Sequence, residues 1–115
     1  MRRKRYQSKT DCPVEAAVTV IGGLWKPLIL FALLDERRRF GELSRMVPGA
    51  TQRMLTLQLR ELEADGIITR TVYAEVPPRV DYQLTDAGRT LEPLLRSLHE
   101  WGFEHLKRRT NQDET

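Results

Sequence analysis

Two adjacent prolines, Pro77 and Pro78, constrain the fold of this sequence more than any other feature. They stand between two segments of alternating character, residues 67–74 and 80–84. Proline has no backbone N–H and cannot donate to a strand ladder, so the pair marks a loop. The two segments are therefore predicted to pair as a β-ribbon with a stiff tip, and Arg79 is predicted to extend outward from that tip.

The residues before the ribbon carry helical signals. Apolar residues at positions 14, 17, 18 and 21 share one helical face, and Gly22-Gly23 ends that segment. Pro27 opens the run LILFALL, which is apolar nearly all round and predicts a buried helix. A short extended piece near Arg38 then leads into a helical segment, GELSRMV, that must stop before Pro48-Gly49.

Two more helices complete the pattern. Thr51 is the predicted N-cap of a helix that buries Leu55, Leu59 and Leu62, and Gly66 supplies its C′ position. After the ribbon, Thr85 is the predicted N-cap of one long last helix, which frays into a polar tail. The predicted fold class is mainly α, with a small β component (α+β).

Composition fits one small globular domain. The chain has 115 residues, of which 40% are apolar and 30% charged. Its longest apolar run, 27–34, is far shorter than the roughly 20 residues that span a bilayer. No apolar region follows the basic N-terminus, so no secretory signal is expected and a cytoplasmic protein is predicted. The predicted divisions are a flexible basic arm (1–11), a domain with terminal helices (12–107) and a polar C-terminal tail (108–115).

Positive charge is concentrated at the N-terminus. Five of the first ten residues are Lys or Arg and none is acidic, whereas the whole chain carries +3, so the remaining 105 residues carry −2. A polyanion would therefore have to be bound by local clusters and by the N-terminal arm. The arm is equally compatible with a solvated tail.

One helical face gathers the side chains that DNA recognition uses. In the helix that begins after Thr51, the leucines fall on one side and a polar set falls on the other: Gln52, Arg53, Thr56 and Arg60. Arginine pairs with guanine, glutamine with adenine, and threonine with a base or a phosphate. A helix, a Pro-Gly turn, a second helix and then a ribbon is the order of a winged helix-turn-helix, in which the second helix enters the major groove.

The same segments resemble the HxlR family of bacterial winged-helix transcriptional regulators. The matching stretches are CPVEAAVTVIGGLWKPLIL, RRFGEL, PGATQRMLTLQLRELEADGII, VYAEVPPRVDYQLTDAGRTL and EWGFEH, which together cover about residues 12–105. The resemblance implies a homodimer that binds double-stranded DNA at a palindromic operator and acts at the bacterial nucleoid. It implies a recognition helix from Thr51 to Asp65 and a wing contact at Arg79. No cofactor or metal is expected.

Other basic residues are predicted to contact phosphate. Lys26, Arg38 and Arg39 fit phosphate contacts better than base contacts, and simple solvation of their charges is an equally good explanation. Phosphate contacts set affinity and register, whereas base contacts set sequence preference.

Apolar surplus on the terminal helices predicts the dimer interface. The last helix carries more apolar length than a small core needs, the first helix has a second apolar stripe, and the family resemblance agrees. The predicted interface residues are Val14, Val18, Leu91, Leu94, Leu95, Leu98 and Trp101. A two-fold dimer would place its recognition helices about 34 Å, one DNA turn, apart.

Cys12, the only cysteine, directly precedes Pro13 and adjoins the N-cap of the first helix. The helix dipole and Lys9 favour a thiolate there, whereas Asp11 and Glu15 oppose it. From the residues alone, a lone cysteine is most simply a small inert side chain. The resemblance implies instead a sensor of oxidants or electrophiles, which a single cysteine could serve through an intermolecular disulfide, a mixed disulfide or an adduct.

Three further functional hypotheses are considered. An enzyme is disfavoured because His99 and His105, six residues apart, lie on different sides of a helix and cannot share a metal ion. The serines also show no nucleophile motif. A winged-helix module that binds proteins remains an alternative to DNA binding. Four aromatic residues could line an effector pocket, although such residues more often belong to the core: Trp25, Phe31, Phe40 and Trp101.

Overall fold

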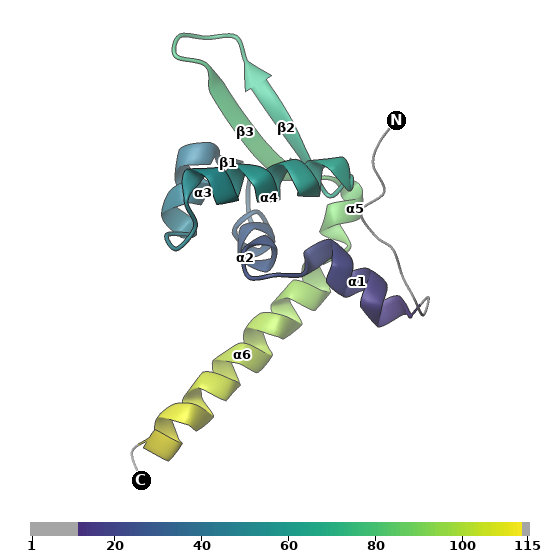
Figure 1. Ribbon diagram of the computed structural model, residues 1–115, viewed down its shortest axis with the longest axis vertical. Coiled ribbons are helices and arrows are strands. Elements are labelled where there is room, and N and C mark those ends of the chain that lie inside the picture. The colour runs from purple at the N-terminus through teal and green to yellow at the C-terminus, as the bar shows by residue number, and fades with distance from the viewer. Residues whose placement is uncertain (1–11, 114–115) are drawn as a thin grey trace.

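The computed structural model describes residues 12–113 and confirms the winged helix-turn-helix fold (Figure 1). Two helices precede the first strand: α1 (Pro13–Ile21) and α2 (Trp25–Ala32). The remaining elements are β1 (Arg38–Arg39), α3 (Phe40–Met46), α4 (Gln52–Ala64), β2 (Ile68–Tyr73), β3 (Arg79–Leu84), α5 (Asp86–Arg89) and α6 (Glu92–Asp113). The β2–β3 ribbon extends from one end of the molecule and α6 from the other.

The helix-turn-helix consists of α3, the turn around Pro48-Gly49, and α4. The Thr51 hydroxyl accepts a hydrogen bond of 3.1 Å from the Met54 N–H, as the predicted N-cap. Gly66 follows α4 with φ of 76°, a left-handed conformation that glycine adopts without strain. These local signals set the start and the end of α4.

The core lies between α2, α4 and the base of the sheet. Ile29 and Leu30 of α2 are fully buried, which confirms the prediction from the LILFALL run. The three leucines of α4 are also buried, at 0–1% exposure, and Leu43, Ile68 and Leu95 join the same cluster. Burying one face of α4 against α2 leaves its opposite face open to solvent.

The sheet has three antiparallel strands in the order β1-β3-β2, because the short extended piece before α3 pairs with β3. Ile68 lies opposite Leu84, and Arg70 lies opposite Tyr82. Since strand side chains alternate between faces, these four residues share the face that carries the core. The other face carries Asp81 and its neighbours, and the five-residue loop 74–78 joins the two long strands.

The predicted single last helix is wrong at both ends. Thr85 does cap a helix, but that helix is only the four-residue α5. Pro93 has no N–H to donate to the Arg89 carbonyl four residues earlier, so the α5 ladder cannot run on into α6. At the other end, residues 108–113 of the predicted tail continue α6. The predicted basic arm, 1–11, lies outside the described residues.

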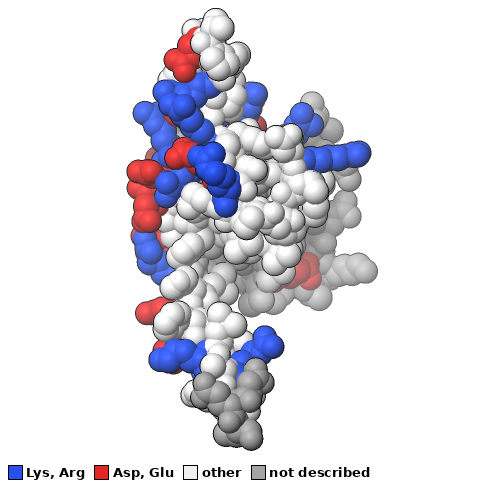
Figure 2. All heavy atoms as spheres, turned by 90° about the vertical axis from the view of Figure 1, so that its left-hand side faces the viewer, with Lys and Arg blue, Asp and Glu red and all other residues white. Residues whose placement is uncertain are grey.

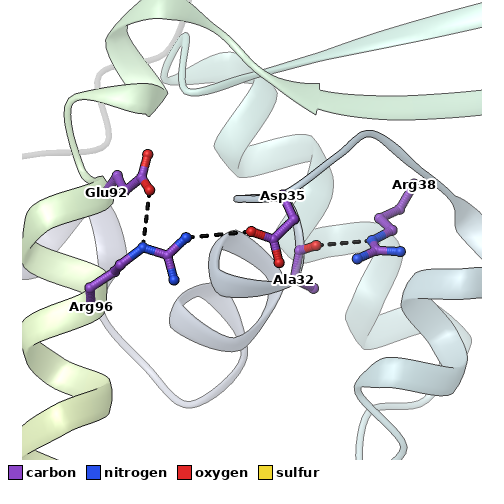
Figure 3. Close-up of polar contacts among 5 residues, drawn as sticks. All are labelled: Ala32, Asp35, Arg38, Glu92 and Arg96. Atoms are coloured by element: carbon purple, nitrogen blue, oxygen red, sulfur yellow. Dashed lines mark hydrogen bonds and ion pairs between the residues drawn. The ribbon is translucent and has the colours of Figure 1, made fainter.

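Packing of α6 against the body sets the direction in which it leaves the domain. Leu95 is 2% exposed and belongs to the core. Arg96 bridges Glu92 of α6 at 3.0 Å and Asp35, just after α2, at 3.4 Å (Figure 3). Beyond this junction α6 extends away from the other helices.

Within residues 12–113, no single helix is both long and apolar enough to cross a membrane. Helices α1 and α2 together reach that length and composition, but they are bent by 76° at the break between them. Ile29 and Leu30 of α2 are fully buried in the protein core.

Candidate nucleic-acid interface

A groove of about 1080 Å³ separates the open face of α4 from the core side of the sheet. Four residues of the predicted recognition set line it together: Gln52, Arg53, Thr56 and Arg60. Phe40, Leu57, Leu59, Glu63, Arg70 and Tyr82 complete the lining. The structure therefore brings the predicted base-reading side chains to one surface, as the helical periodicity required.

The arginines of this groove have no partner within residues 12–113. Arg53, Arg60 and Arg70 make no hydrogen bond, ion pair or ring contact with any described residue. Glu63 is the one acidic residue among the lining residues, so the groove carries a net charge of about +2. Unpaired guanidinium groups in an open groove can bind a polyanion without first breaking an ion pair.

Lys26 does not fit the predicted phosphate contact. Its side chain is 5% exposed, and Nζ lies 2.5 Å from Oε1 of Glu61. Position 26 faces the interior because α2 packs against α4, and Glu61 neutralises the buried ammonium group. The prediction for Lys26 is corrected: it links two helices inside the domain.

Arg38 is also held by the protein itself. Its Nε donates to the Ala32 carbonyl at 3.0 Å (Figure 3), and a terminal nitrogen pairs with Glu36 at 2.8 Å. Its side chain is only 18% exposed. Arg38 therefore ties β1 to the end of α2, and it is not a free phosphate contact.

Two other predicted contacts remain exposed. Arg39 lines a hollow of about 550 Å³ between the start of α3 and the wing loop. Thr51 caps α4 with its oxygen, which leaves its O–H free to donate to a phosphate. DNA contacts at both residues stay predictions.

Arg79 is not at the tip of the wing. It is the first residue of β3, and its guanidinium carbon lies 4.0 Å from the centre of the Tyr73 ring. Its Nε is 3.4 Å from Oδ1 of the buried Asp81, an ion pair without hydrogen-bond geometry. Arg37 adds a 2.9 Å hydrogen bond to the Tyr73 hydroxyl and lies 3.8 Å from Asp81. This cluster lies at the outer end of the β2–β3 ladder, next to the tip loop, and its contacts hold Arg79 within the protein.

The tip itself carries no positive charge. Residues 74–78 are Ala, Glu, Val, Pro and Pro, and Val76 is 99% exposed. Figure 2 shows the top of the molecule as white and red spheres, with the blue basic groups beginning below it. The prediction of a cationic tip is therefore wrong.

Sequence reasoning missed Arg70, which lies on β2 and lines the same groove as Arg53 and Arg60. The signal was present in the strand period. Positions 68, 70 and 72 share the core-side face, and Arg70 is the charged residue between two apolar ones. A cation at an expected core position indicates that the core ends there and that a solvent-filled groove begins.

Exposed apolar side chains lie on both terminal helices. Val14 and Val18 of α1 are 69% and 56% exposed, and Trp101 of α6 is 65% exposed. Leu94 and Leu98 are also exposed, whereas Leu95 is in the core and Leu91 packs against it. Leu95 is therefore removed from the predicted interface set, and Leu91, which is only partly buried, stays a prediction with the others. Of the four aromatic residues considered for an effector pocket, Trp25, Phe31 and Phe40 pack against the core and Trp101 is exposed, so the pocket stays a prediction.

Cys12 is exposed at the N-cap of α1. Its side chain makes no capping hydrogen bond. The pKa of the thiol is nevertheless held below its ordinary value, because the backbone N–H groups of Glu15 and then Val14 stabilise the thiolate. A lowered pKa places more of the reactive thiolate at neutral pH.

The described part of the chain contains no group of three or more His, Cys, Asp or Glu side chains arranged to hold a metal ion. Its two histidines take part in ring stacking: His99 lies against Phe31, and His105 lies against Trp101, with both centroid distances 5.0 Å. Their visible role is packing along α6.

Comparison with known proteins agrees with this geometry. The model of the HxlR-like helix-turn-helix family matches residues 20–110. The HTH-type transcriptional regulator YybR of Bacillus subtilis is 54% identical over 101 residues, which are 88% of this chain and 81% of YybR.

Two solved structures of the redox regulator HypR are also similar. The reduced form has a TM-score of 0.82 at 51% identity and covers 87% of this chain and 99% of that one. The oxidized form has a TM-score of 0.78 at 56% identity and covers 81% and 96%. The chain therefore belongs to the HxlR-like helix-turn-helix family of transcriptional regulators.

Proposed function

We propose that this protein is a homodimer that binds a palindromic operator, with α4 in the major groove and its transcriptional output controlled through Cys12. In this proposal Gln52, Arg53, Thr56 and Arg60 contact the bases, and the β2–β3 ribbon lies beside the neighbouring backbone. Such a regulator acts in the bacterial cytoplasm, at the nucleoid.

One observation carries the DNA-binding proposal. Arg53 and Arg60 lie in one open groove beside α4 and have no partner among the described residues, whereas Arg38 before α3 and Arg79 on the wing are held by ion pairs within the protein. Unpaired charges on a polar helix face add nothing to the stability of the folded protein. Their arrangement suits a ligand that brings negative charge and base edges together.

Exposed apolar surface supports the dimer. Leu94, Leu98 and Trp101 recur at i, i+4 and i+7 along α6, where they form one stripe. Val14 and Val18 add exposed apolar area on α1. A second copy of the chain, related by a two-fold axis, would bury the same surface on both subunits.

Selection of bound duplexes from a random DNA pool, with reduced protein at physiological salt, tests the proposal. The expected result is an enriched inverted repeat whose half-sites are about 34 Å, one helical turn, apart. An enriched single half-site would contradict the dimer. No enrichment, with binding that depends little on salt, would favour a winged-helix module that binds proteins.

The redox part of the proposal rests on Cys12. It is exposed, its pKa is lowered by the N-terminus of α1, and the similar protein HypR is described as a redox regulator with oxidized and reduced forms. An oxidant or electrophile would react with the thiolate. With a single cysteine in the chain, a disulfide would have to be intermolecular.

Cys12→Ser is expected to keep operator affinity while losing its response to diamide or a quinone, because the serine hydroxyl does not form a thiolate. The alkylation rate of the wild-type thiol should rise with pH through a midpoint below that of a free thiol and then level off. Operator binding with and without oxidant, in both proteins, checks the first expectation. An oxidant response that persists in Cys12→Ser would contradict the sensor.

A further inference from the structure

The two faces of the wing sheet hold their arginines differently. On the outer face, Arg79 is stacked on Tyr73 and paired with Asp81, which also lies near Arg37. On the core-side face, Arg70 has no partner among the described residues. The charge that the wing can offer to a ligand is therefore at Arg70, near its base.

The neighbours of Arg70 place it on the wall of the groove opposite α4. Ile68, two residues earlier on the same face, is 1% exposed and fixes the strand to the core. Tyr82, the cross-strand partner of Arg70, is 7% exposed and lines the same groove. Directly opposed residues on neighbouring strands keep their Cβ atoms about 5 Å apart, so the buried Tyr82 limits where Arg70 can go.

Groove geometry separates the role of Arg70 from that of the α4 arginines. A recognition helix presents its polar face to the base edges, and the two sugar-phosphate backbones flank the major groove that holds it. A side chain on the opposite wall, carried by a strand beside the helix, meets the backbone before it can reach a base. Glu63 lines the same groove but forms no ion pair with Arg70, so the charge of Arg70 is not neutralised there.

We propose that Arg70 is a phosphate-binding residue, and that the wing contributes charge to the DNA complex through Arg70 at its base instead of through Arg79 or the tip. This inference rests on the proposed DNA-binding function. It adds a contact that sets affinity and register without reading sequence.

Salt dependence gives the test a direct measure of this contact. Each phosphate neutralised adds about 0.9 to the slope of log affinity against log salt concentration. Arg70→Ala is expected to lower the slope by about one and to weaken binding roughly fivefold at 0.15 M salt, equally for operator and unrelated duplexes. Arg70→Lys should keep most of the slope, because the charge remains.

Two matched variants complete the experiment. Arg89→Ala removes the same charge from an exposed position on α5 outside the groove, and Arg79→Ala removes the wing arginine that is already paired. Both should keep the wild-type slope. If Arg70→Ala matches wild type in slope and affinity, or if Arg79→Ala alone lowers the slope, the inference is overturned. If the wild-type protein binds no duplex, the proposed function itself fails, a result separate from a failure at Arg70.

Discussion

Replacing Arg53 and Arg60 together with alanine is expected to weaken operator binding by about 2–6 kcal/mol, since each bidentate base contact discriminates by about 1–3 kcal/mol. The two residues are seven positions apart on α4, about 10 Å along the helix axis, so their effects should be nearly additive. Loss should be greater for the operator than for unrelated DNA. Titration of operator and scrambled duplexes measures both affinities.

The matched control is Arg89→Ala with Arg109→Ala, which changes the net charge by the same amount away from the groove. This control protein should lose little specific affinity. Equal losses on operator and scrambled DNA in the Arg53 and Arg60 variant would show that these residues bind phosphate and do not read bases. In that case, Gln52 and Thr56 would be the residues that recognise the base sequence.

Glu61→Gln is expected to lower the free energy of unfolding by about 3 kcal/mol, because it leaves the buried ammonium of Lys26 beside a neutral partner. The estimate is at the low end for a buried pair because the Glu61 side chain is 32% exposed. Urea unfolding of the reduced protein measures the change. DNA affinity corrected for the folded fraction should remain close to wild type.

A second substitution distinguishes a structural Lys26 from a phosphate contact. Lys26→Met in the Glu61→Gln background should recover most of the lost stability, because a buried apolar side chain of similar length replaces the unpaired charge. Lys26→Met alone should leave the salt dependence of DNA binding unchanged. A slope lowered by about one unit in that variant would return Lys26 to the DNA surface.

Local signals were sufficient for the elements that carry the candidate site. Thr51 caps α4, Gly66 ends it, and the spacing of Leu55, Leu59 and Leu62 fixes which face is buried. The opposite face follows from the same period, so Gln52, Arg53, Thr56 and Arg60 were placed together correctly. The prediction of a single last helix was wrong because the apolar period continues through Pro93, whereas the missing N–H of Pro93 breaks the helical hydrogen-bond ladder.

The sequence by itself determined the order of the elements and the polar face of α4, because caps, turns and periodicity act between residues close in the chain. Only the tertiary structure decided which cations are free. Lys26 is paired with Glu61, 35 residues away in sequence, on a helix packed against its own. Arg38 and Arg79 have partners close in sequence, Ala32 and Asp81, and the folded path of β1 and β3 brings each pair together. Arg53, Arg60 and Arg70 meet in one groove because β2 returns beside α4. Whether a cation is available to a ligand depends on the folded path of the chain around it, which caps and periodicity do not specify.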